Sequence, residues 1–233
     1  MVGTFVVSNT NIMLVNQTTY QEIVKELEQK HVTLVAVSKT KPVEAIMELY
    51  RLGHRDFGEN YVQELVDKQA ILPSDIRWHF IGHLQTNKVK YIAPFVHLIH
   101  GVDSYKLLKE INKQGEKQER IIDVLLQVHI AQEETKFGLD EKELEDVIRK
   151  TQEEQMRNVA IRGLMGMASF SENQEQVRQE FSSLRMLFEK YAGLPSFSIL
   201  SMGMSGDYQI AIQEGGNMVR IGSLLFGARH YQG

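Results

Sequence analysis

The sequence contains no cysteine in its 233 residues. Disulfide bonds, cysteine nucleophiles and thiolate metal ligands are therefore excluded. Apolar stretches long enough to span a bilayer are also missing. Residues 1–15 are mildly apolar, but they lack a basic leading region and are interrupted by polar residues 8–11, so they do not match a secretion signal. These absences predict a cytoplasmic protein without a membrane partner.

A strong excess of either charge is likewise missing, because 26 basic residues face 30 acidic ones and the formal net charge is −4. This balance gives no electrostatic support for binding nucleic acid or an anionic membrane. The chain also has no Walker phosphate loop, no nucleophile elbow and no Gly-x-Gly-x-x-Gly after its first strand. Its 42% hydrophobic and 24% charged residues are typical of a globular protein.

Strand and helix patterns alternate along the chain. Apolar segments predict eight strands, at residues 32–38, 55–58, 77–81, 98–102, 122–130, 161–168, 197–202 and 218–221. Helical spacing of apolar residues lies between most of them. This alternation predicts an α/β fold with a single TIM-type (β/α)8 barrel, and the length agrees. The alternative is a doubly wound open sheet, which normally has fewer strands. We expect one domain over residues 1–233, in which residues 1–31 are an N-terminal extension and first helix.

Three residues mark expected helix starts. Pro42 ends the first strand and suits the beginning of a helix. Ser104 is a candidate N-cap. Asp140 together with Glu143 has the spacing of a capping box.

Lys39 lies at the end of the first buried strand, after Val37 and Ser38. The carboxyl ends of parallel strands are where α/β proteins place their chemistry. A lysine amine in a partly apolar pocket loses its proton more easily, which suits it to forming a Schiff base. The alternative is a lysine that simply emerges into solvent after the strand.

A second candidate group ends the last strand. Arg220 and Gly222 alternate along this strand, so both side chains are expected on one side of the sheet. A buried arginine needs an anionic or hydrogen-bonding partner, and a glycine lets a ligand approach the main chain closely. Ser223 begins a predicted short helix whose free N–H groups can bind phosphate. The alternative is a surface arginine followed by a turn glycine.

Further polar residues follow other strands. Ser201 and Ser205 end the seventh strand and can add hydroxyl groups to the same anion site. Asn60 follows the second strand. His79 and His83 could be metal ligands, but their spacing and the lack of an evident carboxylate partner lead us to expect no metal site. His79 is instead expected to be a hydrogen-bonded core or pocket-wall residue. One lysine, one arginine and a Gly/Ser cup fit a phosphorylated aldehyde cofactor, with a phosphosugar site as the alternative.

Six ordered motifs resemble the pyridoxal-phosphate homeostasis protein family, over residues 32–229. These motifs are AVSKTKP (36–42), FGENYVQE (57–64), WHFIGHLQTNK (78–88), RGLM (162–165), SMGMS (201–205) and VRIGS (219–223). The resemblance implies a TIM-like barrel similar to the N-terminal domain of alanine racemase, and pyridoxal 5'-phosphate (PLP) as cofactor.

The resemblance also implies roles for individual residues. Lys39 matches the lysine that forms the Schiff base with PLP, and Arg220 the arginine that faces the pyridine nitrogen. Gly222 and Ser223 match the main-chain phosphate contacts. The remaining matches are Ser201 and Ser205 on the hydroxyl side of the phosphate cup, and Asn60 as a residue lining the pocket.

An arginine beside the pyridine nitrogen disfavours protonation of that nitrogen, which makes the ring a poorer electron sink. Racemases with this arrangement add a second acid/base group from a further domain and a dimer partner. The chain ends at Gly233, just past the barrel, so we expect no such domain. Nothing in the sequence places Tyr61 or His79 as a second base.

We therefore expect PLP binding for intracellular PLP homeostasis, with little or no turnover and no catalytic residue. Apo PLP-dependent enzymes are candidate recipients, and a monomer is expected. The alternative is a fold-type III PLP enzyme such as an amino-acid racemase.

Overall fold

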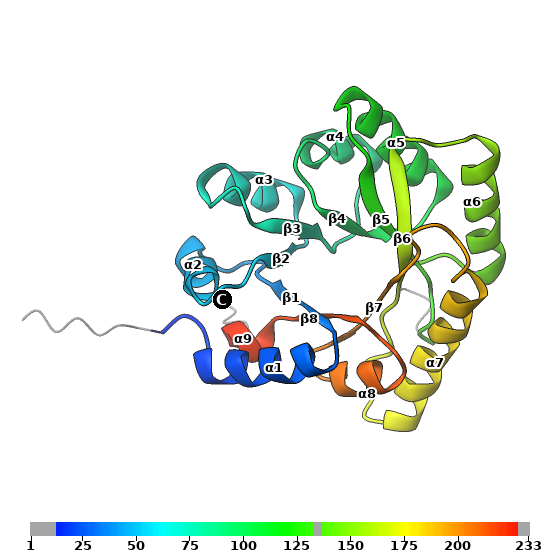
Figure 1. Ribbon diagram of the computed structural model, residues 1–233. Coiled ribbons are helices and arrows are strands. Elements are labelled where there is room, and N and C mark those ends of the chain that lie inside the picture. The colour runs from blue at the N-terminus through cyan, green and yellow to red at the C-terminus, as the bar shows by residue number, and fades with distance from the viewer. Residues whose placement is uncertain (1–12, 133–136, 228–233) are drawn as a thin grey trace, which may run out of the picture.

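The computed structural model describes residues 13–132 and 137–227. Its eight parallel strands form a closed barrel in which each strand pairs with its sequence neighbours and β1 pairs with β8 (Figure 1). The strands are β1 (Thr33–Val37), β2 (Asp56–Glu59), β3 (Arg77–Phe80), β4 (Leu98–Val102), β5 (Ile122–Gln127), β6 (Val159–Met165), β7 (Ile199–Met204) and β8 (Met218–Ile221). The predicted (β/α)8 barrel is confirmed.

Helices connect the strands and cover the outside of the barrel (Figure 1). They are α1 (Gln17–Gln29), α2 (Val43–Arg51), α3 (Val62–Ile71), the 3-10 helix η1 (Thr86–Lys88), α4 (Val89–Ile92), α5 (Tyr105–Lys117), α6 (Glu141–Glu153), α7 (Gln174–Lys190), α8 (Tyr208–Gln213) and α9 (Ser223–Phe226). Among the residues that the structure describes, none forms a helix of the length and apolarity that crossing a membrane requires.

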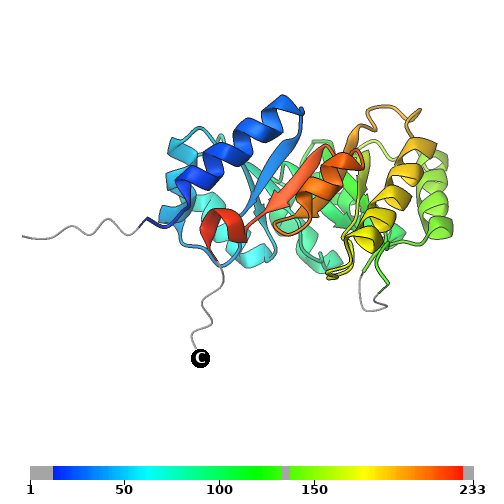
Figure 2. The same cartoon turned by 90° about the horizontal axis from the view of Figure 1, so that it is seen from below.

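Closure of the barrel brings the first and last described helices together. Helix α1 lies beside α9 in both views (Figures 1 and 2). The Asn16 amide, just before α1, donates a hydrogen bond of 2.7 Å to the carbonyl oxygen of Leu225 in α9. In the β1–β8 pair, Val35 is in register with Arg220. The first and last strands therefore end at the same mouth of the barrel.

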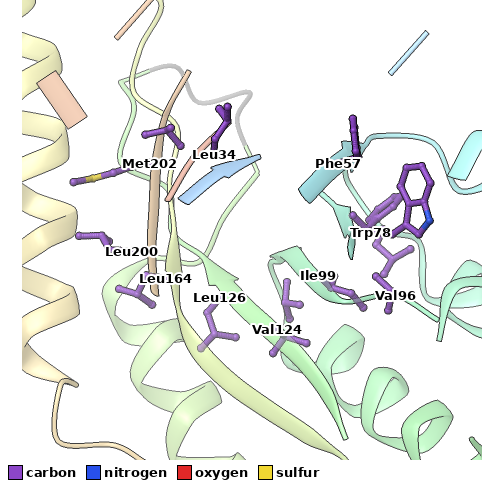
Figure 3. Packing of buried hydrophobic residues seen from close by; sticks show 14 of the residues in the cluster. Leu34, Phe57, Trp78, Val96, Ile99, Val124, Leu126, Leu164, Leu200 and Met202 are labelled. Carbon is purple, nitrogen blue, oxygen red and sulfur yellow. The ribbon is translucent and has the colours of Figure 1, made fainter. Parts of the chain in front are cut away.

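Two apolar cores stabilise this arrangement. The larger one lies between the strands and the surrounding helices, and Phe57, Trp78 and Leu126 are among its residues (Figure 3). The smaller one consists of side chains that alternate with this outer set and fill part of the barrel interior: Val35, Leu98, Leu125, Met165 and Met218. Met167 and Ile199 pack against this smaller core, and the interior also holds buried polar side chains such as His79, His100 and Arg220.

The three helix starts predicted from local signals in the sequence are confirmed. Pro42 precedes α2, Ser104 caps α5 through its hydroxyl, and Asp140 with Glu143 forms a complete capping box on α6. The predicted strand at residues 122–130 is shorter, because β5 ends at Gln127. The chain then forms only an isolated bridge between Val128 and Leu139.

Gly163 in β6 allows two strands to approach closely. Its φ angle is +153°, and a Cβ atom at this position would overlap the main-chain carbonyl oxygen of Ile199 in the neighbouring β7. The pairing of β5 with β6 changes register just before this residue, between Val124 and Leu125. A side chain here would separate β6 from β7, so only glycine fits.

A buried ion pair holds the segment that follows β1. The Lys68 ammonium donates to Glu59 Oε1 at 2.7 Å and to the carbonyl oxygen of Ser38 at 2.8 Å. The Ser38 hydroxyl donates to the same Glu59 oxygen at 2.6 Å. Beyond Lys39, the Thr40 amide donates to Glu64 Oε1 at 2.6 Å, and Lys68 also bonds this carboxylate. The main chain is thus fixed on both sides of Lys39.

Replacing Gly163 with alanine tests the close approach of β6 and β7. We expect Gly163→Ala to lower the free energy of unfolding by more than about 3 kcal/mol, because strain and steric overlap add. Gly53→Ala is the matched control: its φ is +95°, but a Cβ atom added there would have nothing within 4 Å. That control should cost about 1–2 kcal/mol. Equal losses in urea denaturation would contradict the packing argument.

Replacing Lys68 with methionine tests the buried ion pair. The substitution leaves the Glu59 carboxylate buried without its cation, and burial already raises the pKa of this group. We expect a loss of about 3–5 kcal/mol in the free energy of unfolding. Lys113→Met, on the exposed face of α5, should change it by less than about 0.5 kcal/mol. A Lys68→Met protein as stable as this control would show that the pair does not hold the segment.

Candidate functional site

A cavity of about 650 Å³ opens at the carboxyl ends of β1 and β8. Six of the seven residues that the sequence predicts for the site line it: Lys39, Asn60, Ser205, Arg220, Gly222 and Ser223. Two of them come from the first third of the sequence and four from its last part. Closure of the barrel brings them together, and the position matches the mouth where barrels of this type place their chemistry.

Lys39 enters the cavity from the turn after β1. Its side chain is partly buried, and its main chain lies between the anchored residues Ser38 and Thr40. Thr40 has a φ of +62°, a left-handed conformation that a threonine seldom adopts. The bond from its amide to Glu64 compensates for this strain. The turn therefore presents an amine at a defined place in the cavity wall.

Helix α9 presents its amino end to the same cavity. The amides of Leu225 and Phe226 already donate to the Gly222 carbonyl oxygen, so the donors that can bind an anion are the N–H groups at the very start of this short helix. The Gly222 amide, just before the helix, donates to the Ser205 hydroxyl at 3.3 Å. A Cβ on Gly222 would lie 3.3 Å from Val37 Cβ, which is already a tight contact. These groups form a small cup of N–H and O–H donors.

Lys41 is a contributor that sequence reasoning missed. Its ammonium donates to the carbonyl oxygen of Phe226 at 2.9 Å, at the carboxyl end of α9. A cation at this end complements both the free carbonyl groups and the helix dipole. The segment containing Lys39 is thus joined directly to the helix that carries the anion cup. The spacing Lys-Thr-Lys was the available signal, but nothing in it indicates which lysine faces the helix.

Arg220 forms the floor of the cavity and is only 3% exposed. Its Nη1 donates to Ser201 Oγ at 2.6 Å and its Nη2 to the carbonyl oxygen of Gly166 at 3.1 Å. Burial lowers the pKa of Arg220 to about 10, and the charge of Asp207 opposes this. The guanidinium therefore stays protonated at neutral pH, with its position set by Ser201 in the neighbouring β7 and by Gly166, directly after β6.

Ser201 is the one predicted site residue that is not among the described residues lining the cavity. It is fully buried, and its hydroxyl lies between Arg220 and His100 Nδ1, which is 3.2 Å away. This position differs from the hydroxyl side of a phosphate cup. The structure places Ser201 behind the arginine, where it can affect a ligand only through Arg220.

Asn60 brings an unsatisfied polar group to the cavity. Its Oδ1 is buried and has no hydrogen-bond partner among the described residues. An unpaired buried amide is costly, and such a group at a cavity wall suits a ligand with a polar substituent. The oxygen and nitrogen of the amide can exchange places, so it can serve as acceptor or donor.

The histidines are arranged differently from the expectation. His79 is buried and has a carboxylate partner after all, because its Nε2 lies 3.0 Å from Asp56 Oδ1. The expectation that it lacks such a partner is wrong, since the carboxylate comes from the neighbouring strand. His79 is a hydrogen-bonded residue of the interior, as expected. His83 is exposed, lies 3.1 Å from Asp103 and stacks on Phe137.

The chemistry available to the cavity follows from these groups. A lysine amine can condense with an aldehyde, an anion cup can bind phosphate, and a permanent cation can face a ring. The two candidates for a second base do not contribute to this wall. Tyr61 is 57% exposed at the start of α3, and neither it nor His79 is among the described residues that line the cavity.

Comparison with known families agrees with this geometry. The family described as "Alanine racemase, N-terminal domain" matches residues 17–230. The pyridoxal phosphate homeostasis protein of Aquifex aeolicus is 44% identical over 201 residues, covering 85% of this chain and 87% of the relative. The protein of the same name from Escherichia coli K12 is 40% identical over 210 residues, covering 87% and 88%.

Solved structures give the same result. PipY of Synechococcus elongatus PCC7942 without PLP superposes with a TM-score of 0.84 at 34% identity, covering 90% of this chain and 99% of PipY. A structure of PipY with PLP bound gives a TM-score of 0.79, also at 34% identity, covering 90% and 100%. Alanine racemase from Bartonella henselae, at 18% identity and a TM-score of 0.67, shares the fold over 89% of this chain and 58% of its own.

The first two relatives cover most of both sequences at 40% identity or more, and the family match extends from α1 to beyond α9. The chain belongs to the pyridoxal phosphate homeostasis protein family, whose barrel is the alanine racemase N-terminal domain.

Proposed function

We propose that this protein binds PLP as a Schiff base on Lys39 and serves intracellular PLP homeostasis with little or no turnover. One observation carries the proposal: a lysine amine, a buried guanidinium and the amino end of α9 line the same cavity. Relatives named pyridoxal phosphate homeostasis protein and the PLP-bound structure of PipY support it.

The groups of the cavity fit the parts of PLP. Lys39 supplies the amine that condenses with the aldehyde, with loss of water. The Gly222 and Ser223 amides and the Ser205 hydroxyl form the phosphate cup at the start of α9. The unpaired amide of Asn60 is available to a polar substituent of the ring. When bound, PLP supplies an aldehyde and an aromatic ring that can delocalise electrons.

Arg220 argues against efficient catalysis. Its pKa of about 10 keeps it positively charged at neutral pH, and it lies in the cavity floor. A cation at the pyridine nitrogen disfavours protonation of the ring and so weakens its capacity to stabilise a carbanion. Lys39 and Arg220 thus favour holding the cofactor over turning over an amino acid.

The domain organisation, the location, the oligomeric state and the recipients of PLP are also proposed. We infer one PLP-binding domain over residues 1–233, acting as a cytoplasmic monomer. Apo PLP-dependent enzymes are the proposed recipients of the cofactor. The net charge of −4 is consistent with a protein that binds neither nucleic acid nor an anionic membrane.

The anchor of the cofactor can be identified directly. We expect purified protein given PLP to absorb in the visible range, and borohydride reduction with peptide mapping to place the phosphopyridoxyl group on Lys39. Lys39→Ala should lose the adduct because no other amine has the same position. Lys41→Gln is the matched variant at the other lysine of the cavity wall, and it should keep the adduct on Lys39. A colourless protein that takes up no PLP would refute the proposal and favour a phosphosugar site.

Turnover can be measured separately from binding. We expect PLP-loaded protein in D2O to exchange the α-proton of alanine or serine no faster than about the rate of free PLP with the amino acid, because the ring is a weak electron sink. The measurement is proton NMR of the amino acid, with the Lys39→Ala protein as control. Exchange at an ordinary enzymatic rate, on the order of 1 s⁻¹ or faster and lost in Lys39→Ala, would establish the racemase alternative.

A further inference from the structure

A continuous chain of hydrogen bonds crosses the interior of the barrel from Arg220 to Asp56. Arg220 Nη1 lies 2.6 Å from Ser201 Oγ, which lies 3.2 Å from His100 Nδ1. His100 Nε2 lies 3.0 Å from His79 Nδ1, and His79 Nε2 lies 3.0 Å from Asp56 Oδ1. Arg220 lines the cavity, whereas Asp56 is the first residue of β2. The chain therefore connects the two mouths of the barrel.

The three residues in the middle of this chain are removed from solvent. Ser201 and His100 are fully buried, and His79 is 1% exposed. They lie on three different strands, β7, β4 and β3. Three polar groups take the place of apolar side chains in the interior. Burial of this kind is tolerated only when each group has a partner, so the chain is a unit whose members depend on one another.

Arg220 and Asp56, the two ends of this hydrogen-bonded chain, determine the direction of every bond in it. A guanidinium can only donate, so Ser201 Oγ accepts from Arg220. At the other end, an ionised carboxylate can only accept, so His79 Nε2 must carry a proton and donate to Asp56. Burial would raise the pKa of Asp56, but hydrogen bonds from Arg77 and His79 outweigh it and leave this pKa far below its ordinary value.

Only one tautomer of each neutral histidine satisfies both ends. A His79 ring that carries a single proton, on Nε2, has a bare Nδ1, which needs a donor from His100 Nε2. His100 then has a bare Nδ1, which accepts the proton of the Ser201 hydroxyl. Burial, together with the charge of Arg220, lowers the pKa of His100 well below its usual value, consistent with a neutral ring. Every donor in the chain points from Arg220 toward Asp56.

This polarity stabilises the position of Arg220. The hydroxyl oxygen that faces the guanidinium has its own proton committed to His100, so its lone pairs are available to the cation. Bonds aligned in one direction polarise one another and strengthen the whole series. The series of bonds thus links the Asp56 carboxylate to the guanidinium at the other end of the barrel.

The Asp56 end also has the composition of a cation site, because ligand atoms of Asp56, His79 and His97 lie within 4.8 Å of one another. Arg77 argues against that use. Its guanidinium bonds both carboxylate oxygens, through Nε at 2.7 Å and through Nη2. A metal ion would have to displace this arginine and break the bond between His79 and Asp56. The geometry favours the hydrogen-bonded chain.

We propose that His79 and His100 are positioning residues that hold the Arg220 guanidinium toward the ring nitrogen of the bound cofactor, through a one-directional hydrogen-bonded chain that ends on Asp56. The inference rests on the proposed PLP function for its effect on the cofactor. The chain itself exists in the protein without PLP. Breaking the hydrogen-bonded chain far from the cavity changes the protonation of the ring nitrogen, because Arg220 then loses part of the support that orients its guanidinium.

The variants are chosen to break the chain without touching Arg220 or Ser201. His79→Phe keeps a ring of similar size and removes both nitrogen atoms. His79→Gln retains one acceptor and one donor, and so can reconnect His100 to Asp56. His54→Phe is the control: this histidine is also buried, but it bonds only the main-chain oxygen of Asp56 and packs against Tyr20 and Phe57.

The first readout uses the protein without PLP. Long-range ¹H–¹⁵N spectra of ¹⁵N-histidine-labelled protein should show His79 and His100 as neutral Nε2–H tautomers. The Arg220 side-chain N–H signals should exchange slowly with water, and faster in His79→Phe. Either histidine as the Nδ1–H tautomer would overturn the inference, whether or not the protein binds PLP. Absence of PLP binding would refute only the proposed function.

The second readout uses [¹⁵N]PLP. We expect an unprotonated ring nitrogen in the wild type, a ¹⁵N shift displaced toward the protonated form in His79→Phe, and a PLP dissociation constant raised roughly 2- to 30-fold. His79→Gln should recover most of both values, and His54→Phe should leave both unchanged even where its Tm falls. A wild-type shift and affinity in His79→Phe would overturn the proposal. So would Zn²⁺ binding in calorimetry that is abolished by His79→Phe, because the Asp56 end would then be a metal site.

Discussion

The pairing of β1 with β8 is the constraint on which the candidate site depends. It places Val35 in register with Arg220, so the segment after β1 and the segment after β8 leave the barrel side by side. Lys39 comes from one segment and the amino end of α9 from the other, and the bond from Lys41 to Phe226 joins the two beyond the strands. An open sheet would leave these segments on separate edges. Closure of the barrel therefore creates both the anion cup and the amine that faces it.

A second constraint is the burial of a permanent charge. Arg220 cannot be neutralised at biological pH, so the interior must supply acceptors for it. Uncharged groups, the Ser201 hydroxyl and the Gly166 carbonyl, accept its hydrogen bonds, and the charge of Asp207, which lines the same cavity, also favours the protonated guanidinium. An adjacent carboxylate would hold the guanidinium more strongly, but it would also cancel the charge presented to the cavity. Because the Ser201 and Gly166 acceptors are uncharged, they leave the positive charge of Arg220 available to a ligand in the cavity.

The sequence predicts the fold well because the relevant signals are local. Apolar periodicity and caps such as Ser104 and Asp140 depend on neighbouring residues only. Lys39, Arg220 and Gly222 are predictable for a similar reason, since the end of a parallel strand can be read from the residues before it. The partners inside the barrel are not predictable in this way. His79 meets Asp56 only because β2 and β3 pair in a particular register, 23 residues apart in sequence.

The position of Ser201 cannot be predicted from the sequence for the same reason. A serine at a strand end beside Gly203 suggests a ligand cup, and its sequence gives no sign of which layer of the barrel it occupies. The structure places it one layer below the cavity, in register with Met165 of β6 and Met218 of β8. In a closed barrel, strand tilt sets the level at which each inward residue lies, and tilt is a property of the whole sheet. A one-residue difference in register would exchange Ser201 for an outward side chain, remove the acceptor from Arg220 and leave a buried charge unpaired. The polar interior thus stabilises one strand register over the others, in addition to the preference that the apolar core imposes.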